Sequence, residues 1–89
     1  MDIDNLKIVK MEIKILGTGC TKCKSLEAIT RQAVAELNLN AAIEKIEDIQ
    51  KIMEYGIMHT PGLVINGKVV LSGRLPKISE LKDIITQNQ

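Results

Sequence analysis

The stretch Gly17-Thr18-Gly19-Cys20-Thr21-Lys22-Cys23-Lys24 holds both cysteines of the 89-residue chain. It lies between the apolar run Ile13-Lys14-Ile15-Leu16 and a long helical pattern that begins near Thr21. Two thiols spaced Cys-x-x-Cys at the junction of a strand and a helix are typical of a redox or a metal-binding site. The remainder of the sequence has to distinguish between these two kinds of site.

The residues on either side of the two cysteines predict a strand followed by a helix. Apolar and polar residues alternate over 11–16, which predicts a strand. The glycines that follow end it, because glycine adopts backbone angles closed to other residues. Apolar residues then recur at steps of three and four over 21–37, which predicts a helix with one apolar face. Thr18 or Thr21 is expected to cap the N-terminus of this helix.

The middle of the chain predicts a second strand and a short helix. Residues 41–46 are interpreted as a strand, although alanine is only weakly β-prone. Asp48 is expected to cap a short helix over 49–55, which Gly56 ends. A helix that begins earlier, at Glu44, is also compatible with the sequence because the two patterns overlap.

The C-terminal part of the chain predicts a β-hairpin and a last helix. Two β-rich runs, 62–65 and 68–71, flank Asn66-Gly67. This pair is the strongest short-range hairpin signal, because a type I′ turn needs positive φ at both central residues. Pro76 is expected at the start of a helix whose apolar face is formed by Ile78, Leu81, Ile84 and Ile85. The predicted order is β-α-β-α-β-β-α, an α/β fold with a four-stranded mixed sheet and helices on both faces.

Length, charge and composition exclude several classes of protein. The chain is long enough for one small domain, which we place at 11–89, with 1–10 as an N-terminal appendage. The net charge of +1 and the single aromatic residue, Tyr55, argue against nucleic-acid binding. No apolar stretch spans a bilayer, and the first residues lack a secretory layout. We therefore expect a cytoplasmic protein without membrane contacts, in which Cys-x-x-Cys is catalytic or metal-binding rather than structural. We also expect the protein to be a monomer.

Three features together resemble a known family. Cys-x-x-Cys follows the first strand, Thr60-Pro61 directly precedes the third strand, and a β-hairpin leads into a last helix. This combination resembles the thioredoxin fold. The segments 16–23 and 60–70 are similar to the small thioredoxin-like proteins called redox-active disulfide proteins, over about residues 11–87.

The resemblance implies a thiol–disulfide oxidoreductase that cycles between a dithiol and a disulfide and needs no bound metal or other cofactor. It implies that Cys20 is the attacking nucleophile and Cys23 the resolving thiol, that Pro61 follows a cis peptide bond, and that Thr60 faces the disulfide. The implied substrates are protein or low-molecular-weight disulfides. The implied electron donor is a thiol–disulfide reductase.

The predicted position of Cys20 agrees with this chemistry. The nucleophile in disulfide exchange is the thiolate, and a helix N-terminus favours an anion. Lys22 and Lys24 add positive charge, and Gly19 leaves the sulfur accessible. Thr21 and Lys22 are the two residues between the cysteines in the sequence. Cys23 falls on the apolar face of the predicted helix and is expected to be the more buried thiol.

The sequence departs from ordinary thioredoxins at three places. An aromatic residue usually precedes the first cysteine, where this chain has Gly19, and Gly-Pro usually separates the cysteines, where this chain has Thr21-Lys22. Lys14 stands on the strand before the motif, where ordinary thioredoxins have a buried acidic residue.

Two other functions use the same pair of thiols. Two thiolates suit Cu(I), so a soft-metal carrier is one alternative, although small copper-chaperone domains have the order β-α-β-β-α-β. A closed zinc site needs four ligands, and His59 is the one further candidate ligand in this sequence besides the two cysteines. The other alternative is an interaction module whose disulfide controls partner binding.

Overall fold

The computed structural model describes residues 11–89. Its elements follow in the order β1 (Met11–Leu16), α2 (Thr21–Glu36), β2 (Ala41–Ile46), α3 (Ile49–Glu54), β3 (Gly62–Ile65), β4 (Lys68–Ser72) and α4 (Ile78–Gln87). This order confirms the predicted β-α-β-α-β-β-α fold, and α3 begins after Asp48 rather than at the earlier alternative. The predicted appendage at 1–10 lies outside the described residues.

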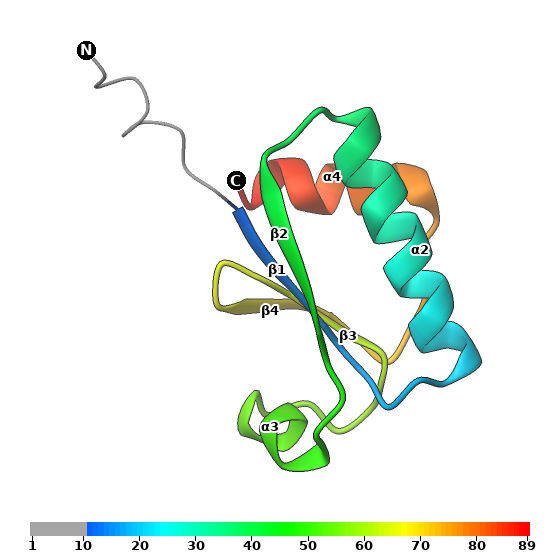
Figure 1. The fold of residues 1–89 in the computed structure, drawn as a ribbon, viewed down its shortest axis with the longest axis vertical. Coiled ribbons are helices and arrows are strands. Elements are labelled where there is room, and N and C mark those ends of the chain that lie inside the picture. Colours follow the sequence, from blue (N-terminus) through cyan, green and yellow to red (C-terminus); the bar gives the residue numbers. More distant parts are fainter. Residues whose placement is uncertain (1–10) are drawn as a thin grey trace.

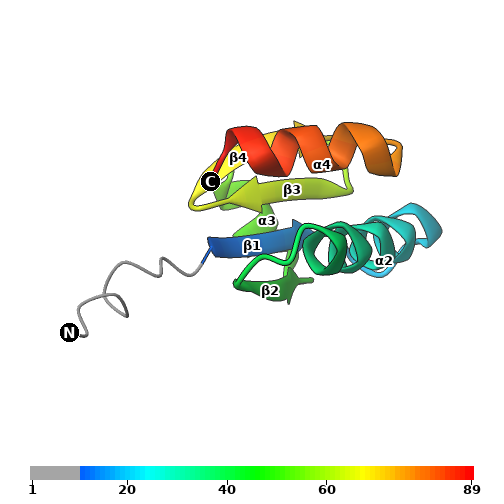
Figure 2. The same ribbon diagram turned by 90° about the horizontal axis from the view of Figure 1, so that it is seen from above.

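The sheet has four strands in the order β2-β1-β3-β4 (Figure 2). Strand β1 pairs in parallel with β2 and antiparallel with β3, so the sheet is mixed as predicted. The hairpin turn at Asn66-Gly67 has the positive φ values of 51° and 85° that the sequence requires. Because β1 and β3 are antiparallel, Leu16 at the end of β1 pairs with Gly62 at the start of β3. The loops attached to these two residues therefore leave the sheet at the same edge.

Helices cover both faces of the sheet, and each face has its own apolar cluster. On one face α2 and α4 pack against the sheet, whereas α3 lies on the opposite face (Figure 1). The larger cluster includes the fully buried Ile13, Leu26, Leu63, Leu81 and Ile85. The smaller cluster consists of Leu16, Ile52 and Val64. Burying one such aliphatic side chain contributes about 1.5–3 kcal/mol. The larger cluster therefore accounts for most of the hydrophobic stabilisation and holds α2 on the sheet.

Two local predictions are wrong. Neither Thr18 nor Thr21 caps α2; the N-cap residue is Cys20, whose Sγ accepts a hydrogen bond from the Cys23 N–H at 3.1 Å. Pro76 does not begin α4 but precedes its N-cap residue, Lys77. In both places the sequence contains a residue type that suits a helix start, and the tertiary path of the loop decides which neighbour takes that position. No helix within residues 11–89 is long and apolar enough to cross a membrane.

Candidate redox site

The two cysteines form a disulfide at the N-terminus of α2, with their Cα atoms 5.0 Å apart. Cys20 is exposed, whereas only 5% of Cys23 is accessible to solvent. The difference arises because Cys23 is on the helix face that packs on the sheet, whereas Cys20 lies one position before the first helical residue. The predicted asymmetry between an exposed Cys20 and a buried Cys23 is therefore present in the structure.

The first turn of α2 offers unpaired backbone N–H groups to Cys20. As the N-cap residue, Cys20 has an extended backbone with φ −67° and ψ 167°, and its Sγ accepts the N–H of Cys23. These N–H groups and the helix dipole favour negative charge at this position. The geometry therefore stabilises a thiolate on Cys20 once the disulfide is reduced.

Gly17 allows the buried sulfur to sit directly against the backbone of the loop after β1. A Cβ built on Gly17 would overlap the Cys23 Sγ and lie 3.0 Å from the Cys23 Cβ. The Gly17 N–H donates to the Ile46 carbonyl at 2.9 Å, which ties this loop to the end of β2. A side chain at position 17 would therefore push Cys23 out of its place.

Three other residues that the sequence predicted for the site are next to the cysteines in the chain, namely Thr21, Lys22 and Gly19. Thr21 and Lys22 are in the first turn of α2 and are both exposed. Gly19 has φ +90°, a left-handed conformation that favours glycine. This conformation brings the chain from the strand to the helix start, so Gly19 shapes the loop in addition to leaving the sulfur accessible.

Thr60 and Pro61 leave the sheet at the same edge as the Cys20 loop, because Gly62 pairs with Leu16. The peptide bond between them is cis. Thr60 is exposed and Pro61 is buried, and the Pro61 carbonyl accepts the Gly73 N–H at 2.8 Å. The hydrogen bond connects the Thr60-Pro61 segment to the loop before α4.

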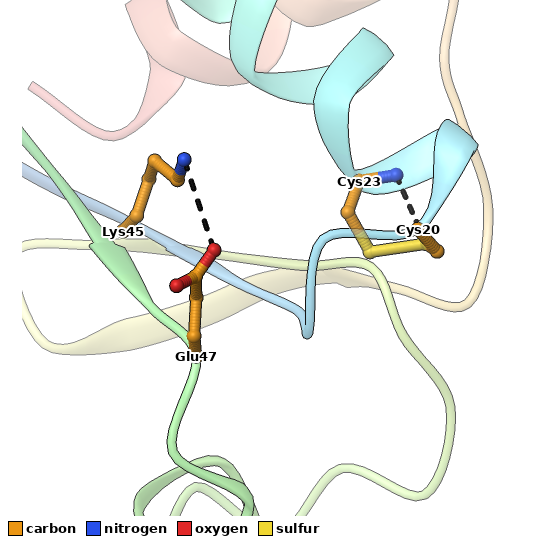
Figure 3. The surroundings of a disulfide bond; sticks show 4 residues. All are labelled: Cys20, Cys23, Lys45 and Glu47. Carbon is orange, nitrogen blue, oxygen red and sulfur yellow. Dashed lines mark hydrogen bonds and ion pairs between the residues drawn. A yellow bond between two sulfur atoms is a disulfide. The ribbon is translucent and has the colours of Figure 1, made fainter.

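A chain of charged residues that no sequence motif predicts lies beside the disulfide. Lys45 Nζ lies 3.6 Å from Glu27 Oε1 and 3.7 Å from Glu47 Oε2. Figure 3 shows Lys45 and Glu47 on the β2 side of the disulfide. Side chains alternate between the two faces of β2, which places residues 43, 45 and 47 on the α2 face. This alternation is the one sequence signal that relates Lys45 and Glu47 to Cys23. It does not show which residues of α2 lie opposite them.

A small cavity of about 40 Å³ connects these charges to the buried cysteine. Its lining includes Gly17, Cys23, Glu27, Lys45 and Glu47. Lys24 also reaches the cavity from α2. Charged residues and the nearly buried Cys23 therefore line one cavity that is large enough for water.

Lys14, which occupies the strand position that is acidic in ordinary thioredoxins, does not line this cavity. Its Nζ donates to the Tyr55 hydroxyl at 3.5 Å, on the face of the sheet that α3 covers. The hydrogen bond to Tyr55 is the main cause that raises the pKa of Lys14 above its ordinary value. Lys14 is thus a cation on the α3 face, whereas the carboxylates that line a cavity with Cys23 come from α2 and from the residue after β2.

Comparison with known proteins places this site in a family. The thioredoxin-domain family model matches residues 11–86. A thioredoxin of Methanothermobacter thermautotrophicus is 41% identical over 76 residues, covering 85% of this chain and 99% of that protein. A thioredoxin of Methanocaldococcus jannaschii is 36% identical over 75 residues, covering 84% and 86% respectively.

Solved structures show the same fold at low sequence identity. The germline-specific thioredoxin Deadhead of Drosophila melanogaster superposes with a TM-score of 0.64 at 16% identity, over 96% of this chain and 86% of that one. Chloroplastic thioredoxin z gives a TM-score of 0.68 at 18% identity, over 98% and 89%. These findings confirm the fold and the resemblance inferred from the sequence. The chain belongs to the thioredoxin family of thiol–disulfide oxidoreductases, with the Cys20–Cys23 disulfide as its redox centre.

Proposed function

We propose that Cys20 is the attacking thiol and Cys23 the resolving thiol in the reduction of disulfides. The reduced protein attacks a substrate disulfide through the Cys20 thiolate and releases one substrate thiol. Cys23 then attacks Cys20 Sγ, which releases the second thiol and leaves the Cys20–Cys23 disulfide. A thiol–disulfide reductase returns the two electrons, as is typical of this family, so the cycle needs no bound cofactor.

The single observation that supports this assignment is the difference in accessibility between the two sulfurs at the start of α2. A substrate disulfide can reach the exposed Cys20 but not Cys23, of which 5% is exposed. The N-cap position also favours the Cys20 thiolate. Lowering a thiol pKa by about 1.5 units requires only about 2 kcal/mol, and unpaired amides with a helix dipole supply an amount of that order.

The Thr60-Pro61 segment supports a protein substrate as one class of partner. Thr60 is exposed and stands directly before β3, at the sheet edge that also bears Cys20. An extended peptide pairs readily with a free backbone segment of this kind. We propose that Thr60 holds the substrate chain beside Cys20 while the disulfides exchange, and that small disulfides react without this contact.

Replacing the resolving thiol tests the assignment. The Cys23→Ser variant should accumulate a mixed disulfide through Cys20 when it is mixed with oxidised protein substrates or with oxidised glutathione. The matched Cys20→Ser variant should trap little, because Cys23 is buried. Intact-mass analysis under non-reducing conditions measures both. Equal trapping by the two variants would contradict the assigned roles.

A redox titration tests the direction of electron flow. The Cys20–Cys23 pair should show one reversible two-electron transition near about −270 mV, the value of a cytosolic reductant, whereas a value near about −120 mV would indicate an oxidant. Thiol trapping and mass spectrometry read the oxidised fraction. A cytoplasmic location and a monomeric state remain predictions from the sequence, which cell fractionation and light scattering test.

The two alternatives from the sequence have less support. The observed β-α-β-α-β-β-α order differs from that of copper-chaperone domains, and the relatives found by sequence are thioredoxins. Neither a soft-metal carrier nor a redox-controlled interaction module is needed to account for an exposed and a buried sulfur at a helix start.

A further inference from the structure

The resolving step needs a proton acceptor for a thiol that solvent barely reaches. Cys23 attacks as a thiolate, yet only 5% of the residue is exposed. An ordinary cysteine has a pKa near 8.5, so at neutral pH Cys23 must lose its proton before or during the attack. The cavity that Cys23 lines is where that proton can leave.

Four charged side chains face this cavity, namely Lys24 and Glu27 from α2, and Lys45 and Glu47 from β2 and the residue after it. A lysine ammonium group has only donors and no acceptor, which leaves the two carboxylates. The volume of about 40 Å³ exceeds the ~10–15 Å³ that one water requires. A proton can therefore pass from Cys23 to a carboxylate through water, a route that general bases commonly use.

The contacts of the two carboxylates distinguish them. Glu27 holds cations at both oxygens, because Oε2 accepts from Arg31 Nε at 3.1 Å and Oε1 lies 3.6 Å from Lys45 Nζ. Within residues 11–89, Glu47 has Lys45 as its one ion-pair partner, at 3.7 Å from Oε2. Glu47 also approaches the cysteine loop, since a Cβ on Gly19 would lie 3.9 Å from its Oε2.

We infer that Glu47 accepts the Cys23 proton through water in this cavity when the mixed disulfide is resolved. Lys45 acts as a positioning residue, because its ion pairs with Glu27 and Glu47 hold the Glu47 carboxylate on the α2 side of β2 (Figure 3). The inference rests on the proposed role of Cys23 as the resolving thiol.

The resolving step conserves electrons and protons. The Cys23 S–H bond breaks and its proton passes through water to the Glu47 carboxylate. The Cys23 thiolate attacks Cys20 Sγ, a new Cys20–Cys23 bond forms, and the bond between Cys20 and the substrate sulfur breaks. The substrate leaves as a thiolate with the electron pair of that bond. The protein dithiol has then lost two electrons and the substrate disulfide has gained them.

Stopped-flow kinetics with an aryl disulfide separate this step from the first attack. Reduced protein mixed with excess reagent should release coloured thiolate in two phases. The first phase depends on reagent concentration and reports the attack of Cys20. The second phase is independent of it and reports resolution by Cys23. The variants are Glu47→Gln, Glu47→Asp and Glu27→Gln, with Glu44→Gln as a matched control on the opposite face of β2.

Glu47→Gln should slow the second phase about tenfold or more near neutral pH, since positioned bases contribute at least that much. Its pH profile should shift to more alkaline pH and meet the wild-type rate where Cys23 ionises unaided. Glu47→Asp should retain most of the wild-type profile, and the first phase should stay unchanged in all variants. Glu47 is 57% exposed at its side chain, so these variants are expected to fold, and circular dichroism checks this.

The outcomes distinguish the inference from the function on which it rests. A second phase in Glu47→Gln that matches Glu44→Gln at every pH would overturn the role of Glu47, as would slowing confined to Glu27→Gln. A wild-type protein without a second phase would contradict the role of Cys23 itself, and the inference would fall with it.

Discussion

Gly17→Ala tests how closely the redox centre packs against the sheet. The added methyl group would overlap the Cys23 Sγ and approach the Cys23 Cβ to 3.0 Å. Neither partner moves freely, because the Gly17 N–H is bonded to the Ile46 carbonyl and Cys23 is fixed in the first turn of α2. The substitution therefore overfills a buried position.

Two opposing contributions determine how much Gly17→Ala changes the free energy of unfolding. The φ of Gly17 is not positive, so alanine fits the backbone and gains about 0.4–1 kcal/mol by restricting the unfolded chain. Overpacking of a close-packed site costs about 1–3 kcal/mol. We expect the free energy of unfolding to fall by about 1–2 kcal/mol, because the overlap involves the first turn of a helix rather than a single flexible side chain.

Thermal unfolding of the oxidised protein, followed by circular dichroism, measures this effect. A loss of that size lowers the Tm by about 5–15 °C in a domain of this length. Gly62→Ala is the matched control, because its Cβ would meet Ile57 Cδ1 at 2.7 Å, the end of a side chain that can rotate away. A Gly17→Ala variant that melts within about 2 °C of the wild type, or above Gly62→Ala, would refute the reasoning.

Three further substitutions test the core, a helix cap and a surface ion pair by thermal unfolding. Leu81→Ala removes a side chain that is 0% exposed and should cost about 2–5 kcal/mol, whereas a loss below about 1 kcal/mol would contradict its central place in the core. Asp48→Ala removes the acceptor of the Gln50 N–H at the start of α3 and should cost about 1 kcal/mol; an unchanged Tm would show that packing alone orders α3. Arg74 holds the pKa of Glu80 below its ordinary 4.5, so this pair stabilises the protein above that pH and loses its effect as the pH falls through the lowered pKa. The Tm difference between Glu80→Gln and wild type should therefore shrink from pH 7 to pH 3, and a constant difference would contradict the ion pair as its cause.

The chain places its charges differently from the pattern of ordinary thioredoxins. The strand position expected to be acidic is Lys14, and this residue bonds to Tyr55 on the α3 face. The carboxylates that share a cavity with Cys23 are Glu27 and Glu47 instead. Their approach depends on the pairing of β1 with β2 and on the packing of α2 over that pair, and both involve residues far apart in the chain.

Local physical chemistry in the sequence determined the elements and the chemical centre. Periods of two and of three to four residues predicted the strands and helices, and Asn66-Gly67 predicted the hairpin, because these signals act between near neighbours. The Cys-x-x-Cys spacing at a helix start similarly predicted an accessible Cys20 and a buried Cys23. The helical spacing of apolar residues did not predict the burial of Thr30, because threonine is polar.

Only the tertiary structure decided what surrounds the two sulfurs. The antiparallel register of Leu16 with Gly62 brings Thr60-Pro61 to the edge where Cys20 lies. Close packing presses Cys23 against Gly17 and leaves the cavity that Glu47 lines. These relations depend on strand register and on the fit of a helix to a sheet. Both are set by the burial of many side chains at once, so no short stretch of sequence contains them.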